Sequence, residues 1–404
     1  MSILQLAKRL NLDVEKLERG DTINTSVTAD SPEHYRDLFG SLSGIAPAHR
    51  PYARHHLSES CCRDCYGAGL LHFSDFLTGA VSAIDPEIGS EFFKRRFPMT
   101  VKLSIAKEIS VTKNTEFPAG TAPVFIACEN LIFNGGSYVL RNTAFTLWVT
   151  NQLSIESSGT LPYHIGILGA PGADGGKGDD GLPMAQAAHG SNAGTPSPGV
   201  CTGAGSGGKG ADGLKGNDGN GGGPGTDGLP SVLSSLNIAS FASPQAPLTV
   251  YGQSGQGGNG GPAGKGGTGQ QGGQGGNGCS SGCEGTDGGN GGNGGQGGTG
   301  GTGGQGGNSP NGGQLHVNLA PAQQGQNFFV YQSGMAKPGA GGARGEAGDR
   351  GAFGGGGSGG HHSRDGTDGS IGTPGTPGTK GNDGTQFGAP PQLILGNYTP
   401  PPSA

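Results

Sequence analysis

The sequence predicts a mainly β and irregular fold, in which a β-solenoid-like unit carries a bundle of glycine-rich polyproline-II helices beside a small N-terminal helical region. Three observations support this class. Glycine accounts for 90 of the 404 residues, about three times its average share. Much of that glycine recurs at every third position in the C-terminal half of the chain. Hydrophobic residues form only 31% of the chain, fewer than a conventional core for this length requires.

Residues 1–98 are expected to form a small, mostly helical N-terminal domain. Apolar residues at helical spacing between Ile3 and Leu12, followed by Gly20, predict a short amphipathic helix over the first 20 residues. A second helix is expected from Pro32 to Leu42.

The same region contains the one concentrated set of residue types that bind metals. The set consists of His55, His56, Cys61, Cys62 and Cys65. A Cys-x-x-Cys pair with upstream histidines fits a tetrahedral zinc site. No second well-spaced pair follows, so a disulfide or buried thiols are the alternative interpretation.

Residues 99–168 are expected to form the β-solenoid-like domain. From Thr100 the hydrophobic period changes from helical to two, and short apolar pieces then follow one another closely. These pieces lie at 101–105, 109–111, 124–126, 131–133, 138–140, 145–149 and 153–155. Strands that start about six to eight residues apart favour a solenoid, with an ordinary meander as the alternative.

Residues 169–388 are expected to form the glycine-rich bundle, interrupted by β islands at 232–250 and 315–331, and residues 389–404 a C-terminal strand and tail. The glycine triplets form four blocks: Gly169–Gly181, Gly207–Gly228, Gly252–Gly306 and Gly339–Gly384. Long blocks leave from the second strand of an apolar island. We therefore expect each block to be an excursion that returns to one stack of strands.

The number of glycines per triplet predicts where each block lies. A polyproline-II helix has three residues per turn and no internal hydrogen bonds, so it presents three faces and must bond sideways. A face in close contact with another backbone must be glycine. Gly-Gly-X triplets therefore suit the centre, which Gly252–Gly306 should supply, and Gly-X-Y triplets suit the outside. A collagen triple helix and a flexible linker are the alternatives.

Gly-Gly-X triplets such as those at Gly257–Gly267 and Gly288–Gly307 resemble the glycine-rich polyproline-II bundles of the snow flea antifreeze protein and of phage tail-fibre adhesin tips. The pattern is also loosely similar to bacterial collagen-like surface proteins. The resemblance covers roughly half of the chain and concerns fold more than function. In adhesin tips the loops between helices bind the receptor, and the resemblance implies the same for the loops of this chain.

Breaks in the triplet phase mark the expected loops. The phase breaks at Gln270, Cys279 and Ser363, and a break is what a turn between two helices requires. The candidate recognition residues at these tips are Cys279, Cys283, His361, His362 and Arg364, with plain connectors as the alternative. Cys279 and Cys283 either close a small disulfide loop or stay reduced.

Composition argues against several function classes. A net charge of -6 without a basic stripe excludes a typical nucleic-acid binder. No stretch is long and apolar enough to span a membrane, and the N-terminus does not resemble a signal peptide. We expect an extracellular, cell-surface or virion location reached by a non-classical route, with cytoplasmic accumulation as the alternative.

The sequence also argues against enzymatic or calcium-binding chemistry in the repeat region. The acids of the expected solenoid form no evident pair for glycoside chemistry, and chance matches to Gly-x-Gly-x-x-Gly carry no weight in such a sequence. The aspartates of the glycine blocks lack the spacing of calcium-binding β-rolls. Pairing with lysines across helices, for example through Lys177, Lys209, Lys215 and Lys380, is the expected role. The sequence predicts no enzyme activity and no cofactor.

The predicted function is a non-enzymatic structural or adhesive protein that presents the loop tips of a rigid bundle. The expected partner is a cell-surface receptor or glycan, or another copy in a homo-oligomer. A secreted toxin or host-targeting factor whose glycine-rich module binds a receptor is the first alternative. A collagen-like trimeric surface protein is the second.

Overall fold

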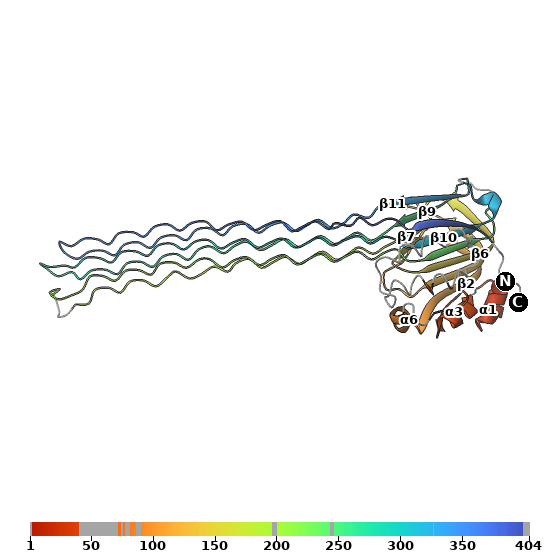
Figure 1. Cartoon of the computed structure of the whole chain (residues 1–404), viewed down its shortest axis with the longest axis horizontal. Helices are drawn as coiled ribbons and strands as arrows, with labels where there is room; N and C mark the ends of the chain where they lie inside the picture. The colour runs from red at the N-terminus through yellow and green to blue at the C-terminus, as the bar shows by residue number, and fades with distance from the viewer. Residues whose placement is uncertain are drawn as a thin grey trace.

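The computed structural model describes residues 2–39, 72–73, 76, 81–85, 90–195, 200–242, 246–325 and 327–398. It has a head made of sheets and helices and a long, narrow rod that extends from one end of the head (Figure 1). Both described ends of the chain lie in the head, on the side away from the rod.

Twelve strands form two sheets in the head. The seven-stranded sheet has the order β1-β2-β4-β6-β8-β10-β12, and the five-stranded sheet has the order β11-β9-β7-β5-β3. The first sheet contains β1 Ile23–Ala29, β2 Met99–Val111, β4 Val124–Asn134, β6 Phe145–Ser157, β8 Ser234–Ile238, β10 Gln314–Leu319 and β12 Gln392–Asn397. The second contains β3 Thr115–Phe117, β5 Tyr138–Arg141, β7 Ile165–Leu168, β9 Leu248–Gln253 and β11 Phe329–Gly334. All pairs are parallel except β1 with β2.

The core of the head lies between the two sheets. Inward side chains of both sheets, such as Leu147, Leu236, Val250 and Ile167, form one buried hydrophobic cluster. The four residues of β7 are all buried, as is typical of parallel strands covered on both faces. Every apolar piece between 101 and 155 named from the sequence lies in a strand, and the two islands supply β8, β9, β10 and β11.

The predicted fold class is wrong. The structure is mostly sheet, one mixed and one parallel, with few helices, and this fits an α/β fold rather than a β-solenoid of polyproline-II helices. The strand pairs are parallel, so the meander alternative is also wrong. The spacing of apolar pieces along the chain indicates how often the chain turns. It does not decide which sheet the next strand joins.

Short helices and one strand precede β2. They are α1 Ile3–Arg9, α2 Val14–Glu18, α3 Pro32–Phe39 and α6 Ser90–Arg96. The expected first helix is divided in two, because Asn11 has a left-handed φ of 54° and Asp13 caps the start of α2. The strand β1 was not predicted. Buried residues of α1 and α3 pack with Val101, Phe125 and Trp148 of the seven-stranded sheet in a second cluster.

Six extended glycine-rich segments, none of them assigned to a helix and almost none to a strand, form the rod. We name them G1 (169–194), G2 (203–229), G3 (254–279), G4 (285–309), G5 (336–360) and G6 (364–388). G1 leaves from β7 and G2 returns to β8. G3 and G5 likewise leave from β9 and β11, and G4 and G6 return to β10 and β12. The predicted return of each excursion to the strands is confirmed.

Backbone hydrogen bonds that recur every third residue hold the segments side by side. G1, G3 and G5 run in parallel, as in the bonds from Gly172 N–H to Gln256 O and from Gly260 N–H to Ala340 O, each 2.8 Å. G2, G4 and G6 form a second parallel layer, with bonds such as Gly291 N–H to Thr367 O at 2.9 Å. Bonds between the layers are antiparallel. The rod is therefore a two-layered slab.

The central position expected for Gly252–Gly306 is confirmed. This block supplies G3 and G4, each of which bonds to four neighbouring segments, whereas G1 and G6 each bond to two. In G4 a Cβ atom at Gly303 would overlap the carbonyl of Gly342, and one at Gly304 would overlap that of Gly223. The third residue of the triplet, Thr302, is exposed. A segment with glycine on two of its three faces is therefore buried against neighbouring segments on both of those faces.

The phase break at Gln270 is not a turn. Gln270 occupies a glycine position in G3, and its side chain accepts the N–H of Leu214 at 2.8 Å and donates to the carbonyl of Ala185 at 2.8 Å. In the facing part of G1, the hydrogen bonds to G3 skip from Gly181 to Ala187. A side chain thus replaces main-chain bonds where G1 departs from its triplet phase.

Candidate functional site: the distal turns of the rod

Three turns join the segments, and all three lie at the end of the rod far from the head (Figure 1). The first lies between G1 and G2 and is described at residue 195 and residues 200–202, the second joins G3 to G4 at residues 280–284, and the third joins G5 to G6 at residues 361–363. The breaks at Cys279 and Ser363 therefore mark turns at the tip, as expected.

The middle turn is a closed hairpin. The N–H of Thr286 donates to the carbonyl of Cys279 at 3.0 Å, and the N–H of Cys279 donates to the hydroxyl of Thr286 at 2.8 Å. Ser281 donates its N–H and its hydroxyl to the carbonyl of Glu284, at 2.9 and 3.1 Å. These bonds fix the backbone and leave Ser280, Cys283 and Glu284 exposed.

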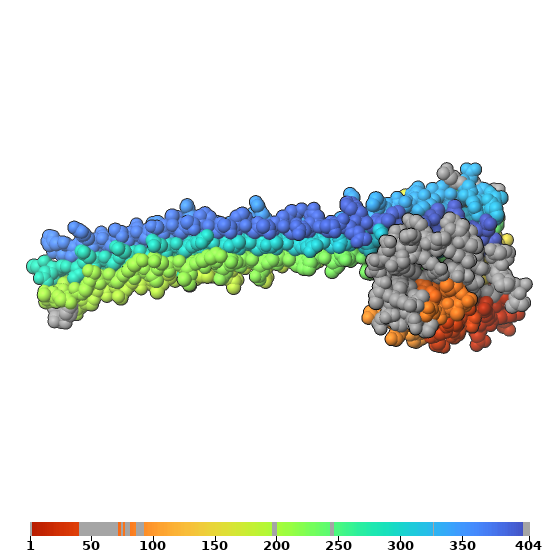
Figure 2. Space-filling model, in the orientation of Figure 1, coloured from red at the N-terminus to blue at the C-terminus, as the bar shows by residue number. Residues whose placement is uncertain are grey.

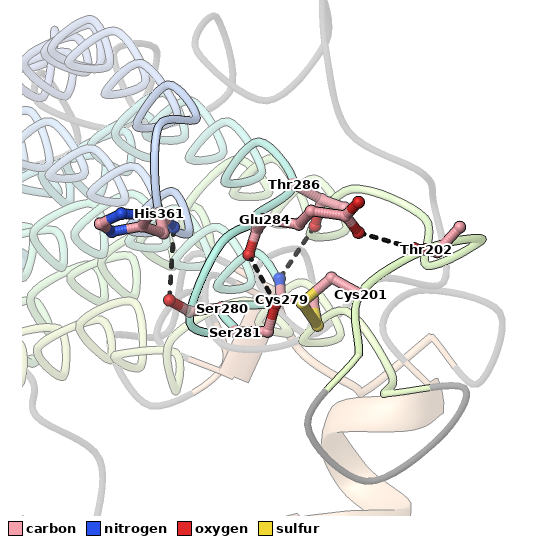
Figure 3. Close-up of a disulfide and its surroundings, with 8 residues drawn as sticks. All are labelled: Cys201, Thr202, Cys279, Ser280, Ser281, Glu284, Thr286 and His361. Atoms are coloured by element: carbon pink, nitrogen blue, oxygen red, sulfur yellow. Dashed lines mark hydrogen bonds between the residues drawn. A yellow bond between two sulfur atoms is a disulfide. The ribbon is translucent and has the colours of Figure 1, made fainter.

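A disulfide ties the first turn to the middle one. Cys201 and Cys279 are bonded, with Cα atoms 5.8 Å apart and a sequence separation of 78. Beside it, the Thr202 hydroxyl donates to the Glu284 carboxylate at 2.6 Å. Figure 3 shows both links between the two turns. The disulfide is buried, and Thr202 is exposed.

The third turn packs against the middle one. His361 donates its N–H to the Ser280 hydroxyl at 3.3 Å, and Arg364 donates its N–H to the Asp287 carboxylate at 2.8 Å. His362 has a left-handed φ of 59°, and its ring centroid lies 4.0 Å from that of His361. Both imidazoles and the guanidinium of Arg364 are exposed. The tip therefore presents two imidazoles, a guanidinium, a carboxylate and hydroxyls on a cross-linked backbone.

The disulfide loop between Cys279 and Cys283, one of the two interpretations of this pair, is not formed. Cys279 pairs with Cys201, and Cys283 is a free, exposed thiol. The reason is the position of the first turn: where the chain enters G2, Cys201 lies beside Cys279 and within disulfide range of it. Nothing in the local spacing of the cysteines shows this.

The proposed zinc ligands His55, His56, Cys61, Cys62 and Cys65 lie outside the described residues. Within the described part of the chain, no three His, Cys, Asp or Glu side chains gather as a metal site requires. No helix of the described residues is long and apolar enough to cross a membrane.

The aspartates of the rod act as acceptors for backbone N–H groups of the neighbouring segment. Asp212, Asp218 and Asp227 of G2 accept the N–H groups of Asn293, Thr299 and Asn308 at 2.6–2.7 Å. The same contact recurs at Asp174, Asp180, Asp287, Asp365, Asp368 and Asp383, and at Asn192, Asn259, Asn277, Asn290, Asn293 and Asn308. Most of these contacts satisfy the N–H group of a non-glycine residue, whereas Asp365, Asp368 and Asp383 accept the N–H groups of Gly359, Gly356 and Gly341.

The lysine pairs expected across segments lie instead within one segment. Lys177–Asp180, Lys209–Asp212, Lys215–Asp218 and Lys380–Asp383 are each three residues apart. In an extended chain with three residues per turn, such residues are stacked on one face. The described pair Lys265–Asp349 does join two segments, at 3.0 Å.

Several residues of the tip were not identified from the sequence. Cys201, Thr202 and Glu284 come from the glycine-poor connections, where no repeat fixes their position. Comparison of the chain with protein-family models, with curated proteins and with solved structures found no match.

Proposed function

We propose that the chain is a non-enzymatic structural and adhesive protein that presents the three distal turns of its rod to a surface receptor or glycan. One observation carries this proposal: three turns that are far apart in sequence meet at one end and are joined by a disulfide and side-chain hydrogen bonds. Rigid connection of exposed polar groups lowers the entropy lost on binding.

The length of the rod supports the same function. G3 spans residues 254–279, and an extended chain of this kind rises about 3.1 Å per residue, which places the turns roughly 80 Å from the sheets. Segments G3 and G4 have glycine on two of their three faces, and both faces are buried along the length of the rod. A rod that only connects parts of the head has no need of such reach.

The chemistry of the tip suits a hydroxyl-rich partner. It offers donors on His361 and Arg364 and acceptors on Glu284 and on the Thr202 hydroxyl, whose hydrogen is donated to Glu284. Its mixed charge argues against a partner of strong single charge. A glycan, with many hydroxyl groups that donate and accept hydrogen bonds, fits this set.

A binding assay with tip variants tests the proposal. Fluorescently labelled protein is applied to a glycan array and to whole cells, and the variant His361→Ala/His362→Ala/Arg364→Ala is compared with Lys177→Ala/Lys209→Ala, which changes exposed residues of the rod shaft. We expect the tip variant to lose at least about tenfold in binding, because several hydrogen bonds are removed, and the shaft variant to bind normally. Equal binding of both variants, or none by the unmodified protein, contradicts the proposal.

No observation favours the toxin or the collagen-like trimer over this function. Toxicity of the purified protein to cells would support the toxin, since a display function predicts none.

A further inference from the structure

One side of the molecule carries most of its exposed apolar side chains. This C-terminal side consists of the edges of β11 and β12 and of segments G5 and G6. Five of the nine exposed large hydrophobic residues in the described chain lie there: Met335 (62% exposed), Phe353 (42%), Ile371 (48%), Phe387 (56%) and Leu395 (38%). In Figure 2 this side is the blue upper edge, which runs from the head to the tip.

Both sheets end on this side with edge strands, and within the described residues no further strand pairs with them. The N–H groups of Gln392 and Tyr398 bond to the β10 side, so those of Leu393 and Leu395 point away from the sheet. Strands β11 and β12 each have six residues, with neither a charge nor a proline. Natural edges are usually short, charged or covered. At the opposite edge, β3 has three residues, and its Glu116 pairs with Arg141.

The two edges form a step. Strand β10 follows β8 and strand β11 follows β9, but β12 extends the seven-stranded sheet by one strand beyond the level of β11. Strands β7, β9 and β11 run toward the rod, whereas β8, β10 and β12 start where the return segments enter the head and run away from it. A two-fold axis parallel to the rod therefore places β12 of one copy beside β11 of the other. The two strands then run antiparallel. The axis creates this contact twice, once for each copy's β12.

The same two-fold axis places the G5–G6 edge of one rod against the G5–G6 edge of the other. The N–H of Gly356 donates to Asp368 at 2.8 Å, and the N–H of Gly341 donates to Asp383 at 2.7 Å. This antiparallel register places Phe353 of G5 beside Ile371 of G6. Rotation about the axis exchanges G5 and G6, so Phe353 of each copy meets Ile371 of the other.

A second apolar pair lies at the base of the rod. Ala336 bridges to Gly388, which places Met335 and Phe387 at the same joint, one from each segment. Between the two apolar pairs, Arg344 of one copy faces Lys380 of the other, whose charge is balanced by Asp383 at 2.8 Å. The edge is therefore self-complementary at its two apolar pairs, and Asp383 offsets the like-charged contact between them.

We propose that two copies of this chain form a parallel dimer through the C-terminal side. Strand β12 of each copy pairs with β11 of the other, and G5 packs against G6. A foreign partner would need two strand edges with the same step and two apolar pairs with the same spacing, whereas a second copy has both. The dimer holds two tips side by side and doubles the number of turns presented in one direction.

Sedimentation of the full chain tests the dimer. The unmodified protein should sediment with about twice the mass of one 39.9 kDa chain. Phe353→Asp and Leu395→Lys should each weaken association at least about tenfold, because each places a charge in an apolar contact. The matched controls Leu214→Asp and Leu229→Lys alter exposed leucines on the other side, 65% and 45% exposed, and should remain dimeric. A cooperative melt of each variant verifies that it is folded.

Cross-linking tests the orientation. In a Cys283→Ser background, chains with Phe353→Cys are mixed with chains with Ile371→Cys and oxidised. The parallel axis predicts disulfides between unlike chains in large excess over those between like chains. A monomeric unmodified protein at micromolar concentration, equal effects of Phe353→Asp and Leu214→Asp, or preferential cross-linking between two Phe353→Cys chains would overturn the proposal.

Discussion

At the residue scale, the absence of a side chain is what the rod depends on. Gly303 and Gly304 lie in adjacent positions of G4 and contact two different neighbours, and both donate their N–H groups, to Thr379 and Gly261, at 2.9 Å. A methyl group at either position occupies space that a carbonyl group already fills. The stability of the slab therefore depends on steric contact as much as on hydrogen bonds.

We predict that Gly304→Ala lowers the free energy of unfolding by about 1–3 kcal/mol, the usual cost of overpacking a site that relaxes only in part. The measurement is chemical denaturation followed by circular dichroism. The control is Gln305→Ala, the exposed next residue, which should change stability by less than about 0.5 kcal/mol. Equal stability of the two variants would show that G4 can shift away from its neighbours and make room for the added methyl group.

At the scale of the element, carboxylates link one segment to the next. The N–H of Asn293 and the ammonium of Lys209 lower the pKa of Asp212, and the ammonium of Lys215 and the N–H of Thr299 lower the pKa of Asp218. The N–H of Lys265 and the ammonium of Lys177 lower the pKa of Asp180 in the same way. All three groups favour the charged form in the folded rod.

These shifts predict that the rod loses stability in acid. A carboxyl whose pKa is depressed on folding contributes fully above its usual value of 3.8 and loses that contribution as the pH falls through the lower folded value. The contribution of these carboxyls to the melting temperature should therefore be constant from neutral pH to about pH 5 and fall below that. Burial lowers the pKa of His316 to about 4, so a separate loss from this imidazole begins below about pH 6.5 and is shared by every variant tested. Asp212→Asn/Asp218→Asn keeps the acceptor oxygen but cannot titrate, so its pH profile should be flatter. The exposed control Gln274→Ala should follow the unmodified protein, and a double variant with an unchanged profile would contradict the assignment.

At the scale of the whole molecule, the head and the tip hold the six segments from both ends. The two sheets fix where each segment leaves and returns, and the disulfide joins two of the three hairpins at the far end. A hairpin that frays at its tip would lose the common surface formed by the three turns. The interactions that stabilise the tip are thus the same ones that hold the three turns in one surface.

Removal of the disulfide should loosen the tip. Cys201→Ser/Cys279→Ser removes a cross-link that spans 78 residues, and we expect a loss of about 2–4 kcal/mol in the free energy of unfolding. Hydrogen exchange should rise first at Thr286, whose N–H closes the middle turn, and at Gly360, whose N–H bonds the end of G5 to the carbonyl of Thr286. Cys283→Ser, which changes a free thiol, should behave as the unmodified protein does. If reductant leaves the unmodified protein as stable as before, the disulfide does not hold the tip.

The local features of this protein follow from its sequence alone. The alternation of apolar residues predicts the strands, and the number of glycines per triplet predicts that G3 and G4 are central, because a Cβ atom either fits a contact or does not. The breaks at Cys279 and Ser363 predict two of the turns for the same steric reason. These are rules that act within a few residues.

How these features combine depends on the folded arrangement of the whole chain. That strands lie in two sheets, that Cys279 pairs with Cys201 rather than with Cys283, and that Gln270 bridges Leu214 and Ala185 all depend on residues dozens of positions apart. Such contacts follow from where each excursion returns to the head, and no local spacing encodes that position. The repeat determines what each segment can contact, and the folded head determines which segments it meets.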